Sequence, residues 1–297
     1  ALALIEQDLG NLEHALGHFE KARILCEDTD VENGTLLGLK PSVVVHSFQA
    51  LVLFQMGYPD QARALSVASQ SLSEKLEHPM SICMAHAMDS VMLFARRDAR
   101  ALHQCGARFQ KLAQDHDIPF YASIAKLSLG AAMILQDHDR AGLALLNQGL
   151  AYARDVGFAF QSGVLSCTYL ESLLSLQETE KGLNFAGDVL AYAHQTGEQE
   201  FYPELLRLKG ELQIQAGQQQ KGEQSLHDAL NAAQKQNAKM WELRAALALG
   251  RIYSDADKFE AAQELVRPIL NWFTEGFDMV ELQQAKALLQ HSAEPQP

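Results

Sequence analysis

Three short stretches decide the fold of this sequence: AYARDVGF (151–158), AYAHQTGE (191–198) and NAAQKQNA (231–238). Each begins 40 residues after the one before, and Gly157, Gly197 and Asn237 fall at the same place in each. Glycine and asparagine tolerate the left-handed backbone conformation that ends many helices. The stretches therefore predict three successive helices that stop at the same phase of a repeat.

Small residues recur with the same 40-residue period. Gly130, Gly210 and Gly250 lie in apolar helical patterns, with Leu170 at the remaining position of the series. Twelve residues after these four positions stand Gly142, Gly182, Gly222 and Ala262. A small residue is required where the two helices of a hairpin cross closely. We therefore expect Gly142, Gly182 and Gly222 to be buried, each at the crossing of the two helices of its own hairpin.

The repeat predicts seven helical hairpins in a single domain that covers residues 1–297. Their first helices are expected over 1–9, 41–56, 79–95, 119–136, 159–177, 201–217 and 238–255. Their second helices are expected over 12–28, 59–76, 98–115, 139–156, 179–196, 219–236 and 258–275. Prolines suit the first turn of a helix, where no N–H partner is needed, and stand at or near five of these starts: Pro41, Pro59, Pro79, Pro119 and Pro203.

The end of the chain is expected to form a cap. Trp272 and Phe273 should seal the last hairpin, and Gly276 should end its second helix. A last helix is predicted over 279–290, with Asp278 as its N-cap and Glu281 completing a capping box. Residues 291–297 are expected to fray.

A large residue follows the small one by four positions in several repeats, as at Leu146, Leu226 and Val266. This small-x-x-x-large pattern resembles the second helix of a tetratricopeptide repeat. The resemblance implies an all-α, right-handed superhelical solenoid of about seven tetratricopeptide-like hairpins. The first predicted helix is shorter than the others, which favours a fragment of a larger protein.

Charge and composition exclude several classes of function. The net charge is −13 and the isoelectric point is about 5.3, with no basic cluster that could bind nucleic acid. No stretch is apolar for the ~20 residues that a membrane span needs. The four cysteines are widely spaced, as is typical of reduced thiols in a cytoplasmic protein: Cys26, Cys83, Cys105 and Cys167.

Candidate chemistry is sparse. No phosphate-binding loop is present, so we expect no cofactor, no ATP binding and no catalysis. His14 and His18 lie one helical turn apart but lack a third metal ligand. Cys83, His86, His103 and Cys105 could gather soft ligands between repeats. A buried cysteine and two partly exposed histidines are the favoured interpretation, and no metal is expected.

Several segments carry a more specific family resemblance. They are QMGYPDQARAL (55–65), ELLRLKGELQIQAG (204–217), KGEQSLHDALNAAQKQNAKMWELRAALALGRIY (221–253) and LNWFTEGFDMVELQQAKALL (270–289). Together they resemble the C-terminal tetratricopeptide region of large bacterial signalling ATPases, which are often fused to class III adenylate or guanylate cyclase domains. The resemblance implies a scaffold for protein–protein interaction or a regulatory sensor arm. A small-ligand sensor with a pocket on the concave face is the alternative.

Tetratricopeptide grooves imply candidate binding positions on the first helix of each hairpin: Ile124, Leu127, Ala131, Ile134, Glu171, Glu204, Arg207, Glu211, Arg244 and Arg251. The groove should change from apolar in the middle to charged at the C-terminal end. The apolar part should be covered by a partner protein, an upstream domain or a second copy. Arg244 and Arg251 would grip a partner's carboxylates. Ion pairs within one helix, from Arg207 to Glu204 and to Glu211, are the alternative use of these charges.

Overall fold

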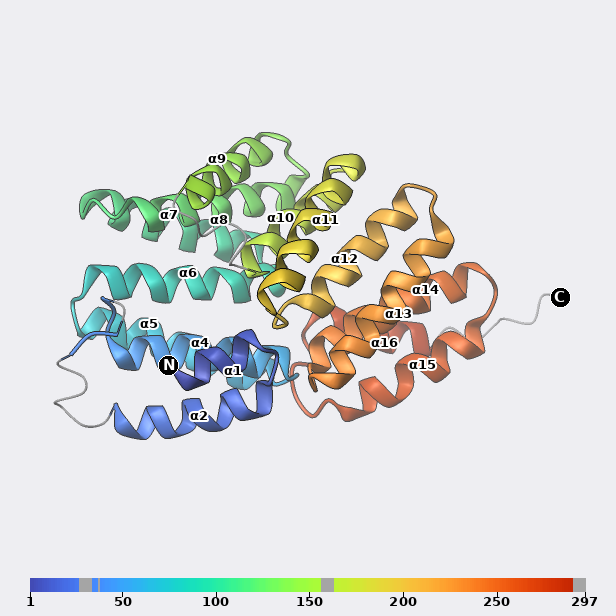
Figure 1. The fold of residues 1–297 in the computed structure, drawn as a ribbon, viewed down its shortest axis with the longest axis horizontal. Coiled ribbons are helices and arrows are strands. Elements are labelled where there is room, and N and C mark those ends of the chain that lie inside the picture. The colour runs from blue at the N-terminus through green and yellow to red at the C-terminus, as the bar shows by residue number, and fades with distance from the viewer. Residues whose placement is uncertain (27–33, 37, 156–162, 291–297) are drawn as a thin grey trace.

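The computed structural model describes residues 1–26, 34–36, 38–155 and 163–290, which form fifteen α-helices and no strand (Figure 1). The predicted all-α solenoid is confirmed. The end of the helix at Gly157, the first residues of the helix at 159–177, and the tail lie outside the described residues. Among the described helices, none is both long and apolar enough to cross a membrane.

The helices pair into consecutive hairpins close to the predicted ranges. In order these are α1 (Leu2–Asp8) with α2 (Leu12–Leu25), α4 (Pro41–Gln55) with α5 (Pro59–Lys75), α6 (Pro79–Ala95) with α7 (Ala99–Asp115), α8 (Pro119–Asp137) with α9 (Ala141–Asp155), α10 (Gly163–Ser175) with α11 (Thr179–Thr196), α12 (Tyr202–Gln215) with α13 (Gln219–Lys235), and α14 (Lys239–Asp255) with α15 (Phe259–Trp272). The last helix is α16 (Val280–Gln290). We number the hairpins 1 to 7 in this order.

Prolines at helix starts and Gly or Asn residues after helix ends lie where the sequence predicts them. A proline stands in the first turn of α4, α5, α6, α8 and α12. Gly197 follows α11 with φ 82°, and Asn237 follows α13 with φ 54°, so both adopt the left-handed conformation. The repeat therefore sets where helices begin and end.

Two of the three glycine crossings form as predicted. A Cβ atom at Gly142 would meet the carbonyl oxygen of Gly130, in the first helix of the same hairpin. A Cβ at Gly222 would lie 2.8 Å from the carbonyl oxygen of Gly210, again within one hairpin. Gly182 differs, because a Cβ there would lie 2.7 Å from Leu212 of the next hairpin.

The C-terminal cap differs from the prediction. Helix α15 ends at Trp272, and Phe273 is already extended with ψ 132°, so the helix stops before Gly276. Helix α16 begins at Val280, so its N-cap position is Met279 rather than Asp278, and Glu281 Oε1 accepts a hydrogen bond from Arg244 Nε at 2.8 Å. The segment 273–279 crosses to hairpins 2 and 3.

The hairpins curve until the two ends of the solenoid meet. Helix α14 contacts α4, and the rings of Trp241 and Phe54 lie 5.9 Å apart in an edge-on arrangement. A Cβ at Gly57 would lie 2.7 Å from Trp272 and 3.0 Å from Phe273. The chain thus closes into a ring of hairpins, and Trp272 and Phe273 seal the joint between its ends. We call this joint the seam: residues 54–61 and 95–96 on one side, and 241–244 and 272–279 on the other.

Candidate functional site

The charged positions of the predicted groove gather around one cavity inside the ring. Its volume is about 240 Å³. Five predicted groove residues line it: Glu171, Arg207, Glu211, Arg244 and Arg251. The rest of the lining comes from the turn after α6 and from α10, α14 and α16: Arg97, Leu174, Ser175, Leu247, Val280, Glu281 and Gln284. We call this the arginine cavity.

Residues 40 positions apart form ion pairs across neighbouring hairpins. Arg244 Nη1 donates to Glu204 Oε1 at 2.9 Å, from α14 to α12. Arg251 Nη2 donates to Glu211 Oε1 at 2.5 Å between the same helices. The sequence repeat places equivalent positions side by side, so these pairs follow from the period itself. Spacing within one helix predicts only the pairs of Arg207 with Glu204 and with Glu211, so these pairs between hairpins were not expected.

Ion pairs within α12 also form. Arg207 Nε and Nη2 each lie 2.8 Å from an oxygen of Glu204, in a two-bond contact. Arg207 Nη1 lies 3.0 Å from Glu211 Oε2. Burial opposes the ionisation of Glu204, but the charges of Arg207 and Arg244 outweigh it and lower the pKa of Glu204 to about 2. The network is therefore ionised at neutral pH.

Arg244 lies inside the protein. Its side chain is 7% exposed, and its guanidinium contacts Glu204, Glu281 and the carbonyl oxygen of Ala95. It therefore cannot grip a partner in this closed form, contrary to the expectation from its place in the repeat. The Arg251 side chain is 54% exposed, so of this pair only Arg251 offers donors to solvent.

The mid-solenoid positions do not line the arginine cavity. Ile124, Leu127 and Ile134 are all buried. The side chain of Leu127 packs where a Cβ of Gly149 would be, 2.7 Å away, and that of Ile134 packs 2.9 Å from the Cβ position of Gly142. Helix α9 of the same hairpin therefore covers both side chains, and no open apolar groove exists at these two positions.

The seam is held by reciprocal contacts between the N-terminus of α5 and the loop that follows α15. Glu275 Oε1 accepts from the backbone N–H groups of Asp60 and Gln61, at 2.9 and 3.1 Å, in the first turn of α5. In return, Asp60 Oδ2 accepts from the N–H of Gly276 at 2.9 Å. A carboxylate at a helix N-terminus is favourable, because it pairs with N–H groups that have no helical partner. Glu275 thus caps a helix that begins about 215 residues away in sequence.

Arginines after α6 reach across the ring. Arg96 pairs with Asp278 at the seam. Arg97, with φ 60°, directs its guanidinium to Glu171 on α10. Burial opposes the ionisation of Glu171, but Arg97, Arg207 and Arg244 together lower its pKa. The turn between α6 and α7 therefore links the seam to the arginine cavity.

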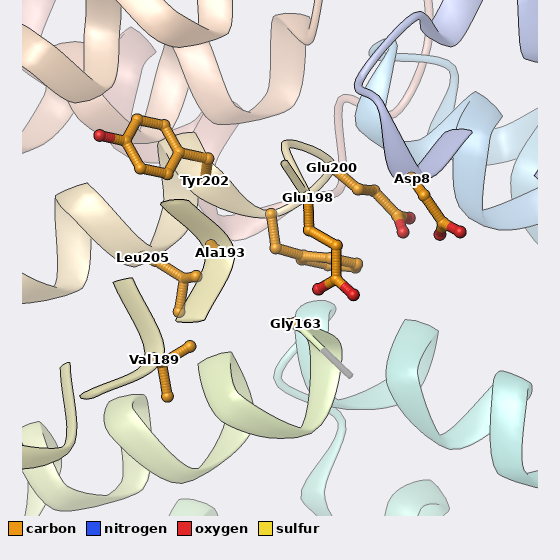
Figure 2. A pocket seen from close by; sticks show the side chains of 9 residues that line it. Asp8, Gly163, Val189, Ala193, Glu198, Glu200, Tyr202 and Leu205 are labelled. Carbon is orange, nitrogen blue, oxygen red and sulfur yellow. The ribbon is translucent and has the colours of Figure 1, made fainter. Parts of the chain in front are cut away.

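A second joint lies between α1 and the turn before α12. Figure 2 shows the carboxylates of Asp8, Glu198 and Glu200 gathered on one side of a small pocket of about 30 Å³. Glu200 Oε1 accepts from Gln7 Nε2 at 2.7 Å and from Gln55 Nε2 at 2.8 Å, so it ties hairpins 1 and 2 to this turn. Burial raises the pKa of Glu200 to about 8 and that of Glu198 to about 7.

Cys83 and Cys105 are buried, His86 is buried rather than partly exposed as expected, and His103 is exposed. Cys105 Sγ donates to the carbonyl oxygen of His86 at 3.3 Å. Burial lowers the pKa of His86 to about 4 and raises that of Cys83 to about 11. Within the described part of the chain, no three histidine, cysteine or carboxylate side chains are placed to hold a metal ion.

The fold of this chain is similar to that of a solved protein. No protein-family model and no curated protein matches this chain. The chain is similar to the crystal structure of a Signal Transduction ATPase with Numerous Domains (STAND) protein with a tetratricopeptide repeat sensor, from Pyrococcus horikoshii. The TM-score is 0.52 at 12% identity, over 96% of this chain and 42% of that chain. This likeness shows the fold, a tetratricopeptide-like solenoid, and this chain spans less than half the length of that protein.

Proposed function

We propose that this chain is the regulatory sensor arm of a larger signalling protein and that it acts through contacts with other protein domains. The STAND protein of similar fold carries a tetratricopeptide repeat sensor. Solenoids of this kind present extended surfaces suited to protein binding. A scaffold or sensor role needs no catalytic residues within the arm.

The seam is the observation that carries this proposal. It joins the first half of the chain to the second through a few polar and aromatic contacts: Arg96 with Asp278, Glu275 with α5, and Phe54 with Trp241. Such a joint can have a closed and an open arrangement, and anything that binds one form better shifts the balance. The segments that carry the family resemblance, around Gly57 and Trp272, contact each other here.

The test uses the longer protein that contains this chain. Glu275→Gln should weaken the seam and change the rate of ATP hydrolysis by the signalling ATPase that we propose. Glu264→Gln is the control, because Glu264 is exposed on α15 and outside the seam. If the longer protein hydrolyses no ATP, or if both variants match the parent, the proposal is wrong.

A small-ligand sensor is the second candidate, and the closed ring favours it. The predicted groove positions are either buried or gathered around a cavity of about 240 Å³, which is too small for a partner helix. Only a small molecule fits there while the seam is closed. Hydrogen exchange distinguishes the candidates: a small ligand should protect amides around the arginine cavity, whereas a partner domain should protect an outer face.

A further inference from the structure

The arginine cavity presents cations to solvent although the whole chain carries a net charge of −13. The Arg251 side chain is 54% exposed and that of Arg97 is 35% exposed. Their acidic partners are more covered, since Glu171 is 12% and Glu211 is 18% exposed. The charge that a ligand meets first is therefore that of guanidinium groups.

The positions of these arginines are held by the network beneath them. Glu211 contacts both Arg251 and Arg207, and Glu171 contacts Arg97 and lies 4.0 Å from Arg207. Side chains held in this way lose little freedom when they bind a ligand, which lowers the cost of binding. A planar guanidinium can donate two parallel hydrogen bonds to one carboxylate.

Apolar side chains lie beside the arginines. Leu174, Leu247 and Val280 share the cavity lining with Arg97 and Arg251. The volume of about 240 Å³ is just below the range of ~300–1,000 Å³ for drug-sized ligands, so the occupant must be small. These features call for one anionic group joined to a short apolar part.

We propose that the arginine cavity binds a small organic acid. Its carboxylate pairs with the exposed guanidinium groups of Arg251 and Arg97, and its hydrocarbon part packs on Leu174, Leu247 and Val280. This proposal rests on the ligand-sensing form of the proposed function and names the class of its ligand. An amine is disfavoured, because it would meet the arginines first.

Isothermal titration calorimetry on the intact chain tests the proposal at constant ionic strength. The probes are acetate, butyrate, hexanoate, succinate and inorganic phosphate. Butyrate or hexanoate should bind more tightly than acetate, because each adds apolar contact area. Arg251→Gln should weaken this binding about tenfold or more, since a charge-assisted contact is lost. Arg267→Gln on α15 is the control and should bind like the parent, because Arg267 is exposed and outside the cavity lining.

Three results would overturn the proposal: no carboxylate binds, Arg251→Gln binds as well as the parent, or phosphate binds as tightly as the best carboxylate. Phosphate lacks an apolar part, so equal binding would indicate a general anion site. These results are separate from the ATP hydrolysis assay. If Glu275→Gln changes ATP hydrolysis but no carboxylate binds, the proposed role as a sensor arm is supported and only the proposed ligand is wrong.

Discussion

A single residue, Arg244, connects three parts of the ring. It contacts Glu204 on α12, Glu281 on α16 and the carbonyl oxygen of Ala95 at the end of α6. Its guanidinium also lies 5.1 Å from the centre of the Trp241 ring. A buried ion network of this kind is costly to break from one side, because the remaining charges lose their partners without regaining water.

The first prediction compares two arginines of one helix. Arg244→Met should lower the free energy of unfolding by about 3–5 kcal/mol, because Glu204 and Glu281 stay buried with less compensation. Arg251→Gln should cost less than about 1 kcal/mol, because its side chain is 54% exposed. Urea unfolding measures both. Equal losses would contradict the assignment of Arg244 to the interior.

Glu200 gives the second prediction, which concerns pH. Burial raises its pKa from 4.5 to about 8, so the folded state keeps a proton that the unfolded state has released between these values. The free energy of unfolding should therefore fall as pH rises from about 4.5 to 8 and change little from this group above that. Glu198, with a pKa raised to about 7, and Asp8, whose pKa is also raised, act in the same direction.

Glu200→Gln isolates this effect. The amide cannot ionise, so the variant should lose less stability than the parent between pH 5 and 8, as measured by urea unfolding at each pH. Glu264→Gln, on the exposed face of α15, should keep the parent's dependence. A parallel pH profile for Glu200→Gln and the parent would rule out a protonated Glu200 in the folded protein.

Small residues decide how closely paired helices approach. In hairpin 4 the backbones of α8 and α9 meet at Gly130 and Gly142. In hairpin 5 the first helix carries Leu170 at the position equivalent to Gly130, and Leu170 is fully buried. The side chain of Leu212, from the next hairpin, packs against Gly182 instead. The same glycine position thus serves different contacts, depending on the residue that stands opposite.

The third prediction compares two glycine-to-alanine changes. Gly142→Ala should destabilise the protein by about 1–3 kcal/mol, because the new methyl group meets the backbone of Gly130. Gly187→Ala should stabilise it by about 0.5–1 kcal/mol, since nothing lies within 4 Å of a Cβ there and alanine favours a helix. Thermal melts check both. A neutral Gly142→Ala would show that α8 and α9 can separate without loss.

Closure of the ring is a property of the whole molecule. Each hairpin adds a small rotation, and after five further hairpins the seventh meets the second. The contact at the seam is close, because Gly276, with φ 73°, packs directly on Pro59. The segment 272–278 therefore holds the ends of the ring together as well as covering the last hairpin.

The fourth prediction tests the seam with a matched pair. Gly276→Ala and Gly217→Ala both place alanine at positive φ, at 73° and 75°, but only the first meets Pro59. Hydrogen exchange at the amides of Asp60 and Gln61, which donate to Glu275, should speed up in Gly276→Ala alone. Similar rates in the two variants would show that the seam does not depend on this contact.

The sequence by itself determined the helices, their order and the period of 40, because prolines, glycines and apolar spacing act within a helix or between neighbouring helices. The same period could have predicted the pairs of Glu204 with Arg244 and of Glu211 with Arg251. Only the tertiary structure decided the ring. The contact of Glu275 with α5 and the burial of Arg244 depend on the small rotation between successive hairpins, added over several hairpins. No local sequence pattern indicates the total rotation. The sequence predicts that Trp272 seals an end of the solenoid, but its partner at Gly57 lies too far along the chain for periodicity to reveal.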